Sequence, residues 1–104
     1  MTPRRSIDFR RIAEEATAKA EPILRRWLPD GRREAGEWVA RNPKRADRRR
    51  GSFKVNLRTG KWGDFASGDK GGDIIALGAF LFDLAQAQAA VRVAEMLGIS
   101  PYGD

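Results

Sequence analysis

The chain has 104 residues, of which 41% are hydrophobic and 33% charged, a composition typical of one folded domain. It contains neither Cys nor His, which excludes disulfides, Cys/His zinc sites, thiol nucleophiles and histidine general bases. Its formal net charge is +6, and no apolar run approaches the roughly 20 residues of a membrane-spanning helix, so we expect a basic cytoplasmic protein without a membrane segment.

The positive charge is concentrated in one segment. Residues 1–50 contain fifteen Lys and Arg against eight Asp and Glu, whereas residues 51–104 contain five against six. Between residues 41 and 61 there are nine basic residues and a single acid, Asp47. Such a cluster is typical of a surface that binds phosphates, although a loop kept basic for solubility is the simpler alternative. The nine residues are Arg41, Lys44, Arg45, Arg48, Arg49, Arg50, Lys54, Arg58 and Lys61.

The first predicted helix runs from about residue 8 to residue 28. Its apolar residues recur at spacings of three and four, which places them on one stripe facing the core. Pro22 removes a backbone donor, so a kink or a restart is expected near Glu21. Pro29-Asp30-Gly31 ends the helix, and Phe9 and Trp27 are expected to pack in the core. The stripe consists of Ile12, Ala16, Ala20, Ile23 and Trp27.

Two strands are predicted in the centre of the chain. Residues 32–36 form a polar connector, and residues 37–41 form the first short strand. Residues 42–51 lack periodicity and are predicted to form a loop, the most basic part of the protein. Residues 52–57 alternate between apolar and polar side chains, as expected for a strand with one buried face. The side chains expected on that face are Phe53, Val55 and Leu57.

A hairpin is predicted to follow. Arg58-Thr59-Gly60 supplies a short turn, so residues 61–65 should return as the antiparallel partner of residues 52–57. Trp62 and Phe65 are out of phase on this strand, and only one of them can face the core if the strand is regular. The sequence leaves open which one does.

A glycine-rich loop over residues 66–72 is predicted to lead into a helix over residues 73–82. The loop lacks the Lys-Ser/Thr ending of a nucleotide-binding loop, so nucleotide binding is not expected. The carboxylates of Asp64, Asp69 and Asp73 could bind Mg²⁺, but one acidic loop without histidine does not predict an enzyme. Asp69 and Asp73 are instead expected to cap the start of the helix.

A last helix is predicted for residues 84–97. Asp83 followed by Gln86 resembles a capping box, and Gly98 is expected to end the helix with Ile99 folding back onto it. The chain is therefore predicted to be one α+β domain. Its parts are a helical lead-in over 1–36, a small antiparallel sheet of about three strands within 37–77, and closing helices within 78–104, so that one N-terminal and two C-terminal helices flank the sheet. The residues expected on the buried side of the last helix are Leu84, Val91, Ala94 and Leu97.

Three short motifs occur in order between Trp38 and Leu77. They are Asn42-Pro43-Lys44-Arg45, with Asp47 two residues further on, then Gly51-Ser52-Phe53-Lys54-Val55, then Gly71-Gly72-Asp73-Ile74-Ile75, with Trp62 before the last. In order and approximate spacing they resemble the N-terminal zinc-ribbon domain of bacterial and phage DNA primases. That family has Cys-Pro-x-His and an acid, Pro-Ser-Phe-x-Val, an aromatic residue, Cys-x-x-Cys-Gly, and Gly-Asp/Asn-x-Ile at these places.

All four metal-ligand positions of that family differ in this chain. They are occupied by Asn42 and Arg45 in the first loop and, depending on a one-residue gap, by Asp64 or Phe65 and by Ser67 or Gly68 in the second. Because Arg and Gly cannot ligate zinc through a side chain, the resemblance implies a ribbon without its metal. Structural zinc contributes about 10 kcal/mol or more to a small domain, so core burial must replace it. The side chains expected to do so are Trp38, Phe53, Val55, Leu57 and Phe65.

With its leading helix, Trp27-Leu28-Pro29-x-Gly31 and closing helices, the whole chain is similar to the zinc-free ribbon at the front of phage and mobile-element primase-helicase proteins. The resemblance implies a non-catalytic, cofactor-free domain that binds single-stranded template DNA and works with a primase catalytic domain or a helicase. RNA in place of DNA stays open. Basic side chains would hold phosphates, and Trp62 would stack on bases. The implied nucleic-acid-binding residues are Arg41, Lys44, Arg45, Arg48, Arg49, Arg50, Lys54, Arg58, Lys61, Trp62 and Lys70.

A second interpretation belongs to another class of protein. A small phage or mobile-element protein could use the same scaffold to bind a host protein, for instance to inhibit a defence complex. Its basis is that the sequence starts with Met, stops soon after its last helix and contains no catalytic domain. Binding that survives nuclease treatment would favour this interpretation.

Overall fold

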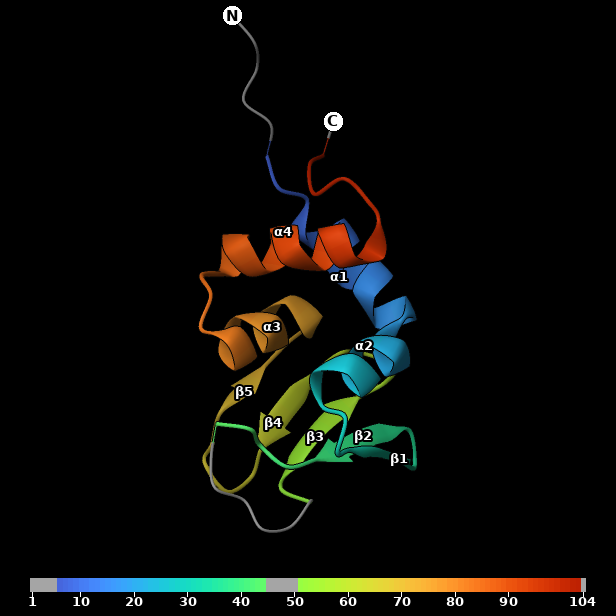
Figure 1. Cartoon of the computed structure of the whole chain (residues 1–104), viewed down its shortest axis with the longest axis vertical. Coiled ribbons are helices and arrows are strands. Elements are labelled where there is room, and N and C mark those ends of the chain that lie inside the picture. Colours follow the sequence, from blue (N-terminus) through green and yellow to red (C-terminus); the bar gives the residue numbers. More distant parts are fainter. Residues whose placement is uncertain (1–5, 45–50, 104) are drawn as a thin grey trace, which may run out of the picture.

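The computed structural model describes residues 6–44 and 51–103. Over these ranges the chain is α+β, with four helices and a five-stranded antiparallel sheet (Figure 1). The described part therefore has one more helix and two more strands than the sequence predicts. The elements are α1 (Phe9–Ala18), α2 (Ala20–Trp27), β1 (Arg32–Glu34), β2 (Glu37–Ala40), β3 (Phe53–Asn56), β4 (Trp62–Asp64), β5 (Lys70–Gly71), α3 (Ile74–Phe82) and α4 (Gln86–Leu97).

The predicted N-terminal helix is divided into α1 and α2. Asp8 caps α1 by accepting the backbone N–H of Arg11, and the helix ends where Lys19 adopts φ −120° and ψ 30°. Pro22 has no N–H to donate and its ring would clash with the carbonyl four residues before it. Within the first turn of a new helix neither constraint applies, so α2 starts just before Pro22. The break thus falls at Lys19, two residues ahead of the predicted one.

Residues 32–36 form a hairpin with β2, and the prediction of a polar connector is wrong. β1 pairs with β2 in the register Arg32↔Val39 and Glu34↔Glu37. The turn residues Ala35 and Gly36 both have positive φ, 48° and 83°. Such turns favour Asn or Asp before Gly, and because Ala stands at that position the sequence carries only a weak turn signal.

The five strands follow one another in sheet order β1-β2-β3-β4-β5, each antiparallel to the next. The predicted central hairpin is confirmed, with Phe53 opposite Asp64 and Val55 opposite Trp62. Part of the predicted glycine-rich loop is the short edge strand β5, which places Gly71 opposite Trp62.

The core lies between the sheet and the helices, with α2 and α3 next to the sheet and α1 and α4 beyond them (Figure 1). The sheet contributes Trp38, Phe53, Val55 and Trp62, all of which are buried. Trp38 also donates its indole N–H to the carbonyl of Leu28, at 3.1 Å, which satisfies an acceptor at the end of α2. This bond ties the end of the helical lead-in to the sheet.

The start of α3 is capped as predicted by one of the two acids. The Oδ1 atom of Asp73 accepts the N–H of Ala76 at 2.8 Å. The prediction for Asp69 is wrong, because its carboxylate accepts the hydroxyl of Ser67 within the preceding turn. A single N-cap side chain therefore defines this helix start.

The predicted capping box at Asp83 is displaced. Asp83 has φ 54° and ends α3 in the left-handed conformation, so α4 starts later than predicted. Its N-cap residue, Ala85, donates its N–H to Oε1 of Gln88, at 3.0 Å. The predicted ending is confirmed, since Ile99 donates its N–H to the carbonyl of Ala94 and Gly98 has φ 72°.

The buried side of α4 consists mainly of alanines, which allow close approach to its neighbouring helices. Of the residues predicted there, Ala94 is buried, whereas Leu84, Val91 and Leu97 lie half-buried at the margin. The buried residues of α4 are Ala89, Ala90, Val93 and Ala94.

Phe9, predicted to be in the core, is 41% exposed. Among the described helices, none alone is long and apolar enough to cross a membrane. Taken together, α3 and α4 reach that length and apolar composition, and they are bent by 110° relative to one another.

Candidate nucleic-acid interface

The side of the sheet that faces away from Trp38, Phe53, Val55 and Trp62 is called here the outer face. The strand register places one row of residues straight across it. Three of the five residues in this row are basic, one is a half-buried glycine and one is a buried valine. The row consists of Arg32, Val39, Lys54, Gly63 and Lys70.

Phe65 is the exposed aromatic residue of the outer face. It directly follows β4, and 83% of it is accessible to solvent. Its backbone N–H is donated to the carbonyl of Ser52 at 3.0 Å, which fixes the chain beneath the ring. The Nζ atom of Lys54 lies 5.8 Å from the ring centroid, within the range of a cation–π contact. An aromatic ring held this way offers a flat apolar surface to a ligand.

A shallow depression of about 230 Å³ lies beside this ring. Lys54, Lys61 and Gly63 line it, and Glu37 is the acidic residue among its lining residues. Within residues 6–44 and 51–103 no carboxylate forms a salt bridge with Lys54, Lys61 or Lys70. Three ammonium groups on this face are thus available to a negatively charged ligand.

Trp62 cannot be the stacking platform that the sequence suggests. It is 6% exposed and belongs to an aromatic cluster, with ring centroids 5.9 Å from Phe53 and 5.0 Å from Phe80. Its position opposite Val55 places it on the core side of the sheet. Phe65, three residues later, lies on the other side, so its predicted burial is wrong as well.

The register of the hairpin settles this alternative. Asn56 donates its N–H to the carbonyl of Lys61 at 2.8 Å, so these two polar residues close the hairpin as a pair. Because Asn56 alternates with the buried Val55, its partner Lys61 points outward and the next residue, Trp62, points inward. The turn length therefore determines which aromatic residue is exposed.

Two of the predicted phosphate ligands interact with the fold itself. The Nζ atom of Lys44 contacts the carboxylate of Asp83 and lies 5.2 Å from the ring centroid of Phe80. This position is at the carboxyl end of α3, where the helix dipole favours a cation. Arg41 donates its backbone N–H to Oδ2 of Asp30, and its Nε atom lies 3.9 Å from the same oxygen.

The remaining predicted residues lie apart from these. Arg58 is exposed in the turn between β3 and β4, and Lys70 lies on the edge strand β5. Arg45, Arg48, Arg49 and Arg50 lie outside the described residues. Ala40 of β2 and Phe53 of β3, which flank these positions in the sequence, are paired in the sheet.

A buried hydrogen bond connects the ends of β2 and β4. Asn42 donates from Nδ2 to Oδ2 of Asp64 at 2.8 Å, and the two residues are 1% and 2% exposed. The Oδ1 atom of each residue accepts a backbone N–H from two residues further on, Asn42 from Lys44 and Asp64 from Ala66, both at 2.9 Å. Each residue thus closes its own tight turn while it binds the other.

Over the described ranges no three Asp or Glu side chains gather closely enough to hold a metal ion. Comparisons of the chain with known protein families, with curated proteins and with solved structures found no match. The interpretation of the outer face therefore depends on its own residues and their geometry.

Proposed function

We propose that this chain is a non-catalytic domain that binds single-stranded DNA and belongs to a primase-type replication protein of a phage or mobile element. The observation that carries the proposal is Phe65, whose ring is 83% exposed on a sheet face beside Lys54 and Lys61. An exposed aromatic residue among unpaired basic side chains is the arrangement with which proteins hold unpaired bases and their phosphates.

The aromatic and basic residues of the outer face would bind different parts of a DNA single strand. A base would stack on Phe65, which contributes about 1–3 kcal/mol per base and tolerates any base because each has a π-face. Lys54, Lys61 and Lys70 would hold phosphates on either side. Gly63 has no side chain to fill the space beside the ring. Duplex DNA keeps its bases stacked on one another and could not use Phe65 in this way.

The bond between Asn42 and Asp64 supports the idea of a ribbon that has lost its metal. By the resemblance to primases, Asn42 stands at the first metal-ligand position and Asp64 at one of the two alternatives for the third. Zinc would join these two loops through its ligands, and here a buried side-chain hydrogen bond of 2.8 Å joins them. The burial of Trp38, Phe53, Val55 and Trp62 adds stability that metal binding would otherwise supply.

The proposal is tested by fluorescence anisotropy with a labelled oligonucleotide of about 12 nucleotides. We expect binding to short single strands, and a loss of about 1–3 kcal/mol of binding free energy in Phe65→Ala. Phe82→Ala is the matched control, because Phe82 is also an exposed phenylalanine but lies at the end of α3. Equal binding by the wild type and Phe65→Ala, or no binding at about 50 mM salt, would overturn the proposal. An RNA strand of the same sequence tests the preference for DNA.

A further inference from the structure

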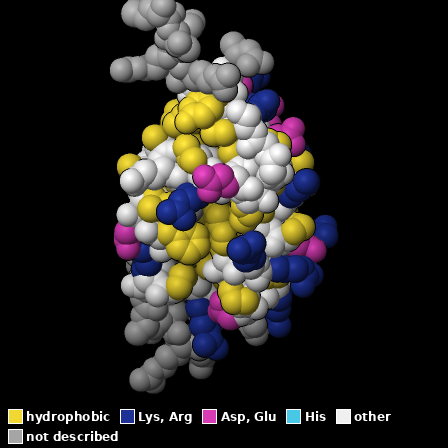
Figure 2. Space-filling view, turned by 45° about the horizontal axis from the view of Figure 1, so that its top comes forward, with side chains coloured by type: hydrophobic (Ala, Val, Ile, Leu, Met, Phe, Trp, Pro, Cys, Tyr) yellow, Lys and Arg dark blue, Asp and Glu magenta, His cyan; other side chains and the backbone are white. Residues whose placement is uncertain are grey.

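A second surface lies among the helices, away from the outer face of the sheet. It is a depression of about 680 Å³ between α2, α3 and α4, called here the helical groove. A smaller one of about 330 Å³ shares Leu84 and Arg92 with it and extends along α4 toward Val91. Figure 2 shows hydrophobic side chains gathered across a face of the molecule with basic and acidic ones between them. The helical groove is bordered by Arg26, Trp27, Phe82, Leu84, Arg92 and Met96.

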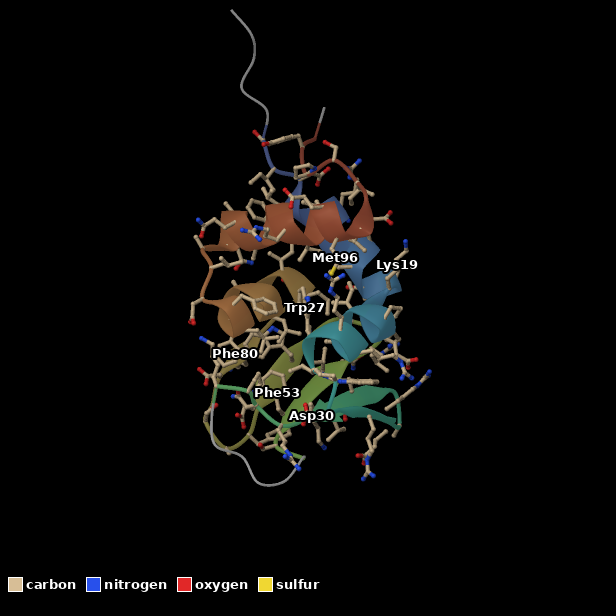
Figure 3. All side chains as sticks on the ribbon, viewed as in Figure 1. Lys19, Trp27, Asp30, Phe53, Phe80 and Met96 are labelled. Carbon is tan, nitrogen blue, oxygen red and sulfur yellow. The ribbon has the colours of Figure 1, made fainter. Side chains whose placement is uncertain are left out.

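The apolar residues that line the helical groove come from three helices and a connection: Trp27 of α2, Phe82 at the end of α3, Leu84 after it and Met96 of α4. The nine residues of α3, IIALGAFLF, include no polar side chain, so the side left uncovered by the sheet and by α4 is apolar too. Phe82 is 51% exposed and meets Trp27 edge to face, with ring centroids 5.4 Å apart. In Figure 3, Trp27 lies beside α3 with Met96 of α4 above it.

The position of Trp27 is fixed by its packing against Gly78 of α3. A Cβ atom at Gly78 would lie 3.0 Å from Cη2 of Trp27, so the indole rests directly on the backbone of α3. The edge-to-face contact with Phe82 holds it from the side. The aromatic floor is therefore preorganised, which reduces the entropy that a ligand would lose on binding.

The charged groups at the rim indicate what kind of ligand fits. Arg26 and Arg92 both border the helical groove, and within the described ranges neither forms a salt bridge with a carboxylate. Glu95 is the acidic residue at the rim. A second copy of the chain would bring the two arginines close to identical ones, and each chain carries a net charge of +6. A ligand complementary to the helical groove therefore has an apolar surface flanked by carboxylates.

We propose that the helical groove binds an acidic amphipathic helix of a partner protein. Apolar residues of that helix, three and four positions apart, would cover Phe82, Leu84 and Met96, and its carboxylates would meet Arg26 and Arg92. Because α4 and the sheet lie at opposite ends of the molecule (Figure 1), the domain could hold this helix and a nucleic acid at the same time.

The test uses the full chain and two synthetic peptides of about 14 residues, long enough for roughly four helical turns. Both have Leu at the same helical spacing, and the remaining positions are Glu in one and Lys in the other. Trp27 is half-buried while Trp38 and Trp62 are buried, so it is the tryptophan whose emission should respond. We expect the Glu peptide to bind, to shift this emission, and to shift amide resonances of α3 and α4.

Arg92→Glu is the decisive variant, because Arg92 is exposed and its replacement leaves the core intact. We expect it to weaken binding of the Glu peptide about tenfold, and Phe82→Ser to weaken it comparably. Phe65→Ala should leave peptide binding unchanged. Equal binding of the Lys peptide, no effect of Arg92→Glu, or resonance shifts confined to the sheet would overturn the proposal. So would binding of anionic lipid vesicles without binding of peptide, or dimer formation that blocks the groove.

Discussion

At the scale of single residues, similar side chains have different roles because of where the fold places them. Lys54 and Lys61 face outward beside Phe65, whereas Lys44 contacts Asp83 and Phe80 at the end of α3. Trp62 and Phe65 are three positions apart, and one is in the core while the other is exposed. Residue type alone therefore predicts the chemistry of the basic segment but not which of its members are available to a ligand.

The bond between Asn42 and Asp64 makes a prediction at this scale. Replacing Asn42 with Ala removes a donor from a buried carboxylate, and a hydrogen bond to a charged group contributes about 1.5–3 kcal/mol. We expect a loss of stability of that size in urea-induced unfolding of Asn42→Ala. Ser67→Ala is the control, since Ser67 bonds Asp69 in an exposed turn. A loss below about 0.5 kcal/mol would mean that the bond does not connect β2 to β4 in the way inferred.

At the scale of elements, the sequence predicts those helices and strands that have a recognisable local residue pattern. The hairpin of β3 and β4 follows from alternation before a glycine turn, and the cap of α3 follows from Asp73. Strands without such a pattern were missed. The turn between β1 and β2 contains Ala35 where a turn residue is expected, and β5 has two residues, too few to alternate.

The division of the N-terminal helix shows the same limit. Pro22 predicts that the helix is interrupted, but the exact break depends on where the new helix can accept a proline. The exposed aromatic of the candidate site was missed for a related reason. Whether Trp62 or Phe65 faces the core depends on strand register, which is a property of two strands and not of one.

The edge strand β5 makes a prediction at this scale. A Cβ atom at Gly71 would lie 2.4 Å from Nε1 of Trp62, a buried ring that cannot move away, whereas Gly72 has nothing within 4 Å. We expect Gly71→Ala to lower the free energy of unfolding by about 1–3 kcal/mol, as overpacking does. Gly72→Ala, one residue away, should change it by less than about 0.5 kcal/mol. Equal stabilities of the two variants would contradict the packing of Gly71 against Trp62.

At the scale of the whole molecule, two surfaces of different composition lie apart from one another. The outer face of the sheet has lysines around an aromatic ring, and α2, α3 and α4 border an apolar groove. The sheet and α4 lie at opposite ends of the molecule (Figure 1). The core that separates them contains residues from both the sheet and all four helices. We therefore expect the two proposed ligands to bind without excluding one another.

The distribution of lysines makes the last prediction. Each phosphate contact adds about −0.7 to the slope of log affinity against log salt for a single strand. We expect Lys61→Ala to make this slope less steep by roughly that amount and to leave unfolding unchanged, because Lys61 is exposed and unpaired within the described ranges. For Lys44→Ala we expect an unchanged salt slope and a lower free energy of unfolding, because the contacts to Asp83 and Phe80 are lost. Titrations at several salt concentrations and urea-induced unfolding separate the two effects. If Lys44→Ala instead made the salt slope less steep, the basic surface would extend around the sheet edge to α3. The outer face alone would then not account for binding.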